Sequence, residues 1–199
     1  ILKRVAGNVI FAGKVQQYIT VIKKRKELEN SSTNKSDGTC DVDTIKTVFL
    51  NKKVGEKRCY KVKEYLGDGG FGVVFKCDKT IKEDTLEVVI KVFFDKKYID
   101  REISSLVNVT DVEGVAKIMD HFVWGDYDCI VTKFINGDSL EKKLKNRSLP
   151  VDTTRKYFIG ILKSLRRIHE SKANLIHGDL RPSNIIINEK EDPVIIDFG

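Results

Sequence analysis

The sequence of this chain predicts an α+β fold in which β-strands come first and a long helix follows. Three observations support this prediction. Short segments rich in valine, isoleucine and phenylalanine recur between residues 57 and 135, as is typical of strands. A turn-forming run of glycines, residues 67–72, separates the first two of these segments. Later, residues 152–169 carry apolar side chains at the three- and four-residue steps of a helix.

Residues 1–56 are predicted to form an N-terminal helical extension followed by a polar linker. Apolar residues recur at three- and four-residue steps over Ile1–Asn30, which indicates a helix. Asn30–Gly38 consists mostly of small and polar residues and is typical of a linker. Thr44–Leu50 alternates between polar and apolar residues, so we expect a strand there, although the sequence does not indicate its partner.

From Lys57 onward the sequence changes to short β-type segments. Five strands are predicted, at Tyr60–Leu66, Val73–Cys77, Leu86–Phe94, Val115–His121 and Cys129–Phe134. Two helices are predicted, a short one at Asp100–Val107 and a long one at Asp152–His169 with Asp152 as its N-cap. Two further strands, Ile185–Asn188 and Val194–Ile196, are expected on either side of a turn.

The composition fits a globular protein rather than a disordered one. The chain has 199 residues, of which 41% are hydrophobic and 33% charged. Its net charge is +7, but 29 acidic residues are mixed among 36 basic ones, so we expect no nucleic-acid binding. The four cysteines form no C-x-x-C pair and are expected to be free thiols, which favours an intracellular, cytoplasmic location.

The N-terminal segment also indicates whether the chain contacts a membrane, and the two chain ends indicate whether the sequence is a fragment. A spanning helix is excluded because Lys14 and the pair Gln16-Gln17 interrupt the apolar stretch. Residues 1–26 would suit a basic amphipathic helix on a membrane surface, but we favour a helix packed against protein. The chain starts at Ile1 and stops at Gly199, from which we expect a fragment of a longer polypeptide.

Five motifs follow one another along the chain and carry its candidate chemistry. Glycines at the first, third and sixth positions of Gly67–Gly72 would let backbone N–H groups approach phosphates closely. This pattern is weak evidence by itself, because dinucleotide-binding folds also use it. It is followed by four further motifs, which are Val88-Val89-Ile90-Lys91, Glu102, His177-Gly178-Asp179-Leu180-Arg181-Pro182-Ser183-Asn184 and Asp197-Phe198-Gly199.

This ordered set of motifs resembles the signature of the eukaryotic protein kinase family. The resemblance covers residues 57–199 and implies a two-lobed kinase fold that stops at the last glycine of the D-F-G motif. The β-rich N-lobe, residues 57–135, would be complete, whereas residues 136–199 would form only the start of the helical C-lobe. The implied activity is transfer of phosphate from ATP, with Mg²⁺, to a protein hydroxyl, with Ser/Thr favoured over Tyr.

The resemblance also implies roles for the polar residues of the motifs. Asp179 would accept or orient the proton of the substrate hydroxyl. Lys91 would contact the phosphates, and Glu102 would pair with it, although Glu87 and Glu113 are competing partners. The remaining polar residues would act on the phosphate and the metal, with Arg181 stabilising the transferring phosphate and Asn184 and Asp197 binding magnesium. Some tyrosine kinases also have arginine at the position of Arg181, so this residue does not decide the acceptor.

The implied ATP-binding residues lie in the glycine run, in two strands and in the following hinge. Thr132 would be the gatekeeper, and the backbone of Lys133 and Ile135 would contact the adenine edge. The complete set of implied ATP-binding residues is Gly67, Asp68, Gly69, Gly70, Phe71, Gly72, Val74, Val89, Lys91, Thr132, Lys133 and Ile135.

Two departures from the family pattern keep alternatives open. Gly178 replaces the arginine that usually precedes the catalytic aspartate and binds a phosphorylated loop, and Val89 replaces an alanine. Glycine before the aspartate also occurs in small-molecule kinases of the aminoglycoside/choline phosphotransferase type, which is one alternative. The other is an ATP-binding pseudokinase module. Because the resemblance implies that the activation segment and the rest of the C-lobe are missing from residues 1–199, we expect these residues to be inactive as an isolated polypeptide and the full-length parent to be an active kinase.

Overall fold

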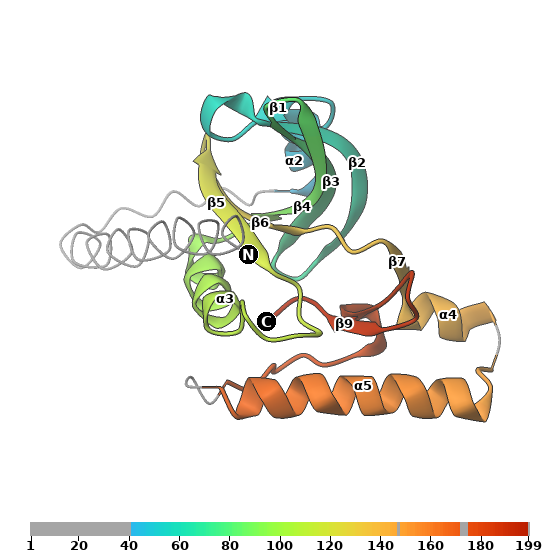
Figure 1. Ribbon diagram of the computed structural model, residues 1–199. Helices are drawn as coiled ribbons and strands as arrows, with labels where there is room; N and C mark the ends of the chain where they lie inside the picture. The colour runs from blue at the N-terminus through green and yellow to red at the C-terminus, as the bar shows by residue number, and fades with distance from the viewer. Residues whose placement is uncertain (1–40, 147, 172–174, 199) are drawn as a thin grey trace. The chain divides into compact units, whose positions relative to one another are not determined.

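The computed structural model describes residues 41–146, 148–171 and 175–198. From Val42 onward these residues belong to one compact unit (Figure 1). The predicted helix Ile1–Asn30 and the predicted linker Asn30–Gly38 lie outside the described residues. Within the described residues, no helix combines the length and the apolar character needed to cross a membrane.

A six-stranded antiparallel sheet forms the first part of this unit, in the order β1-β2-β3-β4-β6-β5. Its strands are β1 (Lys53–Val54), β2 (Tyr60–Gly69), β3 (Gly72–Ile81), β4 (Asp84–Phe93), β5 (Ile118–Trp124) and β6 (Tyr127–Lys133), and the short η1 (Glu56–Arg58) precedes β2. The five predicted strands are confirmed, but β5 begins three residues later than expected. Val115 instead forms a bridge to Ile195, because this segment crosses to a second sheet.

The register of the central strands separates a fully buried face from a partly exposed one. Val88, Ile90 and Val92 of β4 are completely buried. Lys91, between them, is aligned with Val74 of β3 and with Ile130 of β6. Successive side chains of a strand point to opposite faces, so Lys91 lies on the face away from this buried row.

A helix covers one part of the sheet where a strand was expected. The prediction of a strand at Thr44–Leu50 is wrong, since these residues belong to α2 (Val42–Phe49). Ile45 and Phe49, one helical turn apart, are both 0% exposed. Phe49 stacks on Phe75 of β3 with ring centroids 5.8 Å apart, and the edge of Tyr127 contacts it at 5.6 Å. The domain boundary at residue 57 remains a prediction. Two elements that precede this residue already belong to the same unit, since α2 packs on the sheet and β1 is one of its strands.

The helix α3 (Lys96–Asn108) connects β4 to β5 and packs against the sheet. Its start is set by Asp95, whose carboxylate accepts a hydrogen bond from the backbone N–H of Lys97 at 2.9 Å. The predicted helix Asp100–Val107 is therefore confirmed, and it begins four residues earlier. Ile99, Ile103 and Leu106 are buried on the side of α3 that also carries Glu102.

The second part combines helices with a three-stranded sheet in the order β7-β8-β9. Its elements are β7 (Gly137–Ser139), α4 (Leu140–Asn146), α5 (Val151–His169), η2 (Pro182–Asn184), β8 (Ile185–Asn188) and β9 (Pro193–Ile195). The predicted long helix and the last two strands are confirmed, whereas β7 and α4 were not expected. Asp152 is not the N-cap of α5, because Pro150 occupies that position and Asp152 lies in the first turn. Tyr157, Ile161, Ile185 and Ile187 join α5 to β8 in one apolar cluster.

Candidate active site

Lys91 of β4 meets two carboxylates that come from distant parts of the chain. Its Nζ lies 2.6 Å from Oε2 of Glu102 on α3, and it also donates to Oδ1 of Asp197. The two competing partners are engaged elsewhere, since Glu87 pairs with Lys76 at 2.6 Å and Glu113 pairs with Arg167 at 3.0 Å. The structure therefore brings together the lysine and the two acids that the motifs single out.

Burial and charge determine the protonation of this cluster. Burial alone would lower the pKa of Lys91, but the charges of Glu102 and Asp197 outweigh it and raise the pKa above its usual value. The pKa of Glu102 is raised to about 7, mainly by burial. The positive charge of Lys91 lowers this pKa, and the negative charge of Asp197 raises it further. Lys91 is thus a fixed cation, whereas Glu102 titrates close to neutral pH.

We expect Glu102 to titrate near pH 7 in the folded protein rather than at its ordinary value of 4.5. Carboxyl-detected NMR measures this midpoint directly, and Glu102→Gln identifies the signal. Because Asp197 raises the pKa of Glu102, Asp197→Asn should lower the midpoint, and Lys91→Met should raise it. A raised pKa means that the folded state binds this proton more tightly, so the contribution to stability is present below pH 4.5 and is lost as the pH rises through about 7. A midpoint near 4.5 would contradict this assignment.

A second polar group forms around Asp179. The side-chain amide of Asn184 donates to the backbone carbonyl of Asp179 at 2.9 Å and to its carboxylate Oδ2 at 3.0 Å. Nε of Arg181 lies 3.4 Å from the same carboxylate oxygen. Asn184 is buried, while the Asp179 side chain is about half exposed, so the carboxylate is oriented from one side and open to an incoming molecule from the other.

His177 connects Asp179 to the segment that carries Asp197. Its Nδ1 lies 3.3 Å from the backbone N–H of Asp179, and its Nε2 lies 3.1 Å from the carbonyl oxygen of Ile196. These contacts fit a neutral ring that accepts at Nδ1 and donates at Nε2. Burial lowers the pKa of His177, which agrees with the neutral form. The ring also packs on Phe198 with centroids 4.6 Å apart. Sequence reasoning gave His177 no polar role, because this contact joins residues that are far apart in the chain.

The two residues proposed as magnesium ligands are held next to each other by the backbone. The N–H of Ile196, which precedes Asp197, donates to the carbonyl of Asn184 at 2.9 Å. An amide oxygen and a carboxylate are ligand types that suit Mg²⁺, which also keeps waters and substrate phosphates in its shell. The described residues include no group of three or more His, Cys, Asp or Glu arranged to hold a metal ion. The ligand types of Asn184 and Asp197 are those of a Mg²⁺ ion that a phosphate substrate would also bind.

Two residues near this group have left-handed backbone conformations. Gly178 has φ 83° and Asp197 has φ 59°. Any other residue at position 178 would be strained in this conformation, so glycine suits the backbone here. Glycine also means that the positive charge of the arginine usual in the family is absent beside Asp179. Asp197 adopts the left-handed region more readily than most residues, since Asp is one of the few side chains tolerated there.

The glycine run forms the turn between β2 and β3. A Cβ added at Gly72 would collide with the carbonyl oxygen of Val92, so close packing against β4 explains this glycine. At Gly69 and Gly70 an added Cβ would meet no atom within 4 Å, so packing within the protein does not explain those two. The absence of side chains at Gly69 and Gly70 lets an anion approach the backbone of this turn closely. The side chain of Asp68 turns back to accept from the Tyr65 hydroxyl.

The remaining predicted nucleotide residues lie on the partly exposed face of the sheet. Val89 of β4 is aligned with Thr132 of β6, and Val74 of β3 is aligned with Lys91. Beyond Thr132, the backbone N–H of Lys133 already donates to the carbonyl of Lys117 at 3.0 Å. An adenine contact at this residue would therefore be made by its carbonyl. Ile135 lies two residues beyond the end of β6.

Comparison with known proteins agrees with this arrangement. Residues 60–199 match the family model described as the protein kinase domain. The chain is 32% identical over 202 residues to a probable serine/threonine-protein kinase, yakA, of Dictyostelium discoideum, which covers 92% of this chain and 13% of that protein. It is 31% identical to the dual specificity protein kinase YAK1 of Saccharomyces cerevisiae, over 84% of this chain and 23% of that protein. It is also 32% identical to the probable serine/threonine-protein kinase MRK1 homolog of Encephalitozoon cuniculi, over 76% of this chain and 50% of that protein. The alignments thus span half of these relatives or less.

Proposed function

Because this chain belongs to the protein kinase family, we propose that the whole protein is an ATP-dependent protein kinase that phosphorylates Ser/Thr hydroxyls in preference to Tyr. The observation that carries this proposal is one continuous series of contacts. Lys91 bonds to Asp197, His177 links the backbone beside Asp197 to Asp179, and Asn184 donates to Asp179. These contacts support the proposal because they join the residues proposed as phosphate-binding cation, metal ligands and base in one group, as phosphoryl transfer requires.

The side chains of this group divide the work of the reaction between them. Bound ATP would supply the phosphoryl group, and Mg²⁺ would neutralise part of its charge. Lys91 would bind the phosphates, held in place by Glu102, and Asn184 and Asp197 would hold the metal. Asp179 would accept or orient the proton of the acceptor hydroxyl, and Arg181 beside it would attract the transferring phosphate.

The preference for Ser/Thr rests on the relatives rather than on a residue of the site. Those reported above are serine/threonine kinases by name, apart from one dual specificity kinase. We propose an intracellular, cytoplasmic protein because Cys59, Cys77 and Cys129 are free thiols, two of them buried. A substrate protein is the expected partner.

We further propose that residues 1–199 alone do not phosphorylate peptides. On α5, Val151, Phe158, Ile159 and Leu162 are between 45 and 75% exposed. Apolar side chains gathered on one helix are normally covered in an active domain. Phosphorylation of a peptide library by the purified 199-residue chain would overturn this proposal.

The experiment that tests the proposed function uses the whole protein that contains residues 1–199, which is called the extended protein below. It measures magnesium-dependent transfer from labelled ATP to a mixed-sequence peptide library, and the labelled hydroxyl identifies Ser/Thr or Tyr specificity. We expect labelled peptides with the wild-type protein and a rate of labelling about 10²–10⁴-fold lower with Asp179→Asn. Transfer only to small alcohols or aminoglycosides would support a small-molecule kinase instead. Absence of transfer to either class of acceptor would support a pseudokinase.

A further inference from the structure

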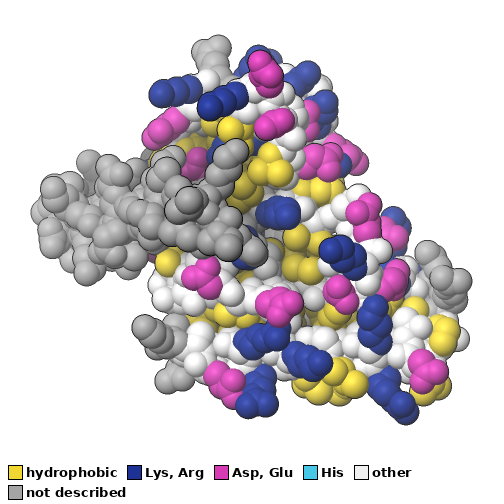
Figure 2. All heavy atoms as spheres, in the orientation of Figure 1, with side chains coloured by type: hydrophobic (Ala, Val, Ile, Leu, Met, Phe, Trp, Pro, Cys, Tyr) yellow, Lys and Arg dark blue, Asp and Glu magenta, His cyan; other side chains and the backbone are white. Residues whose placement is uncertain are grey.

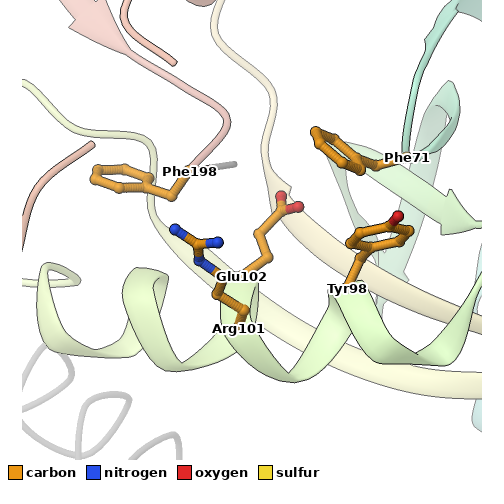
Figure 3. Close-up of a pocket in the computed structure, with 5 residues that line it drawn as sticks. All are labelled: Phe71, Tyr98, Arg101, Glu102 and Phe198. Carbon is orange, nitrogen blue, oxygen red and sulfur yellow. The ribbon is translucent and has the colours of Figure 1, made fainter. Parts of the chain in front are cut away.

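A small cavity lies beside the Lys91–Glu102 pair, between the glycine turn and α3. Its volume is about 70 Å³, and it is lined by Phe71, Tyr98, Arg101, Glu102 and Phe198. Figure 3 shows the rings of Phe71 and Tyr98 facing each other at one end and Phe198 at the other, with the Glu102 carboxylate between them. The cavity therefore brings the glycine turn, α3 and the segment of Asp197 to one place.

The glycine turn touches α3 through one aromatic contact. The ring centroids of Phe71 and Tyr98 are 4.8 Å apart, with the planes tilted by 57°. Tyr98 lies in the first turn of α3, where its backbone N–H donates to the carbonyl of Asp95 at 3.2 Å. This separation falls within the range for favourable aromatic pairs.

Few other contacts restrain the tip of the turn within the described part of the chain. The N–H of Phe94 donates to the carbonyl of Phe71 at 3.1 Å, and Gly72 approaches β4 closely. Gly69 and Gly70 bring no side chain and have open space around them. Asp68 at the base of the turn is held by Tyr65, whereas at the tip itself the ring of Phe71 is the side chain that contacts α3.

Tyr98 and Glu102 are one helical turn apart and lie on the same face of α3. Glu102 on this face contacts Lys91, with 2.6 Å between Oε2 and Nζ, and Tyr98 contacts Phe71 of the glycine turn. The Phe71 ring also lies 6.0 Å from Nζ of Lys91, so the turn covers the lysine from the side of α3. A displacement of α3 that breaks the ion pair would release the glycine turn at the same time.

We propose that Tyr98 is a positioning residue whose ring holds Phe71, and with it the glycine turn, over the phosphate side of the nucleotide site. This inference rests on the proposed function for the identity of the ligand, but the contact itself belongs to the nucleotide-free protein. Tyr98 touches no reacting group. It acts through Phe71 and makes the position of the turn depend on the position of α3.

The test measures amide hydrogen exchange of residues 67–72 in the extended, nucleotide-free protein. We expect Tyr98→Ala and Phe71→Ala each to speed exchange by about two- to tenfold, as suits the loss of one aromatic pair. The double variant should add nothing further, because both changes remove the same contact. Tyr98→Phe keeps the ring and should behave like the wild type, as should Lys96→Ala, which alters an exposed residue of the same helical turn. Unchanged exchange in Tyr98→Ala, or equal acceleration throughout α3, would overturn the proposal.

A second measurement, of ATP binding, distinguishes a failure of this inference from a failure of the proposed function. The affinity of the same variants for ATP with Mg²⁺ is measured by calorimetry. We expect Tyr98→Ala to weaken binding by about two- to tenfold and Tyr98→Phe to leave it unchanged. A wild-type protein that binds no ATP would contradict the proposed function, while the exchange data would still decide the contact. ATP binding that is equal in wild type and Tyr98→Ala would overturn the positioning role.

Discussion

Lys91→Met is expected to lower the rate of phosphoryl transfer by the extended protein by about 10²–10³-fold, the usual cost of removing one preorganised charge-stabilising group. The physical reason lies in the surroundings of Nζ. Lys91 is the cation that meets both Glu102 and Asp197, and its charged form is favoured by both carboxylates. Without it, a bound phosphate would face two acids and no compensating charge at this point.

The neighbouring strand offers a matched control for this substitution. Lys76→Met removes the same side chain from β3, where Lys76 forms an ion pair with the half-exposed Glu87. This pair is partly exposed to solvent, where ion pairs contribute little, so this variant should transfer phosphate at nearly the wild-type rate. The rates are compared at saturating ATP, after circular dichroism has shown that both variants are folded. An active Lys91→Met protein would remove Lys91 from the catalytic group.

Phe49→Ala is expected to lower the free energy of unfolding by about 3–5 kcal/mol, the usual cost of emptying a buried phenylalanine site. Phe49 is 0% exposed and contacts both Phe75 and Tyr127, so its loss leaves a cavity between α2 and the sheet. Urea denaturation followed by circular dichroism measures the change.

A pair of isoleucines provides the control for the α2 interface. Ile45 of α2 is 0% exposed, whereas Ile81 at the end of β3 is 46% exposed. Ile45→Ala should cost about 2–5 kcal/mol, and Ile81→Ala should change stability by no more than about 0.5 kcal/mol. If Phe49→Ala and Ile45→Ala unfold at the same urea concentration as the wild type, α2 does not pack on the sheet as described.

The error at α2 shows where sequence patterns fail. Thr44–Leu50 alternates like a strand, yet Ile45 and Phe49 are also one helical turn apart, so both periods fit this short segment. What selects the helix is the apolar surface of Phe75 and Tyr127, which the local sequence does not contain. Similarly, β7 and α4 are short elements whose strand or helix is stabilised by neighbours in the fold rather than by a periodic pattern.

The candidate site could be anticipated far better than these elements. The resemblance to the protein kinase motifs, in which phosphate and metal chemistry restricts residue types at set places, implied Lys91, Glu102, Asp179, Asn184 and Asp197 as site residues. The structure brings these residues together in two linked groups.

The parts of the site that could not be anticipated are contacts between distant segments. The bridge from His177 to Ile196 and the ring contact from Phe71 to Tyr98 depend on how the segments fold together. Neither contact involves a spacing that is visible in the chain. Sequence reasoning could therefore name the chemical groups but not the residues that position them.

The measurement that tests this account most directly is the transfer of labelled phosphate from ATP, with Mg²⁺, to peptides by the extended protein, compared between wild type and Asp179→Asn. Asp179 accepts from Asn184 and lies beside Arg181, and asparagine keeps its size while removing the proton acceptor. We predict labelled peptides with the wild type and a rate about 10²–10⁴-fold lower with Asp179→Asn, at similar affinity for ATP. Equal labelling by the two proteins would contradict the assignment of Asp179, and with it the central claim that this group of residues transfers phosphate.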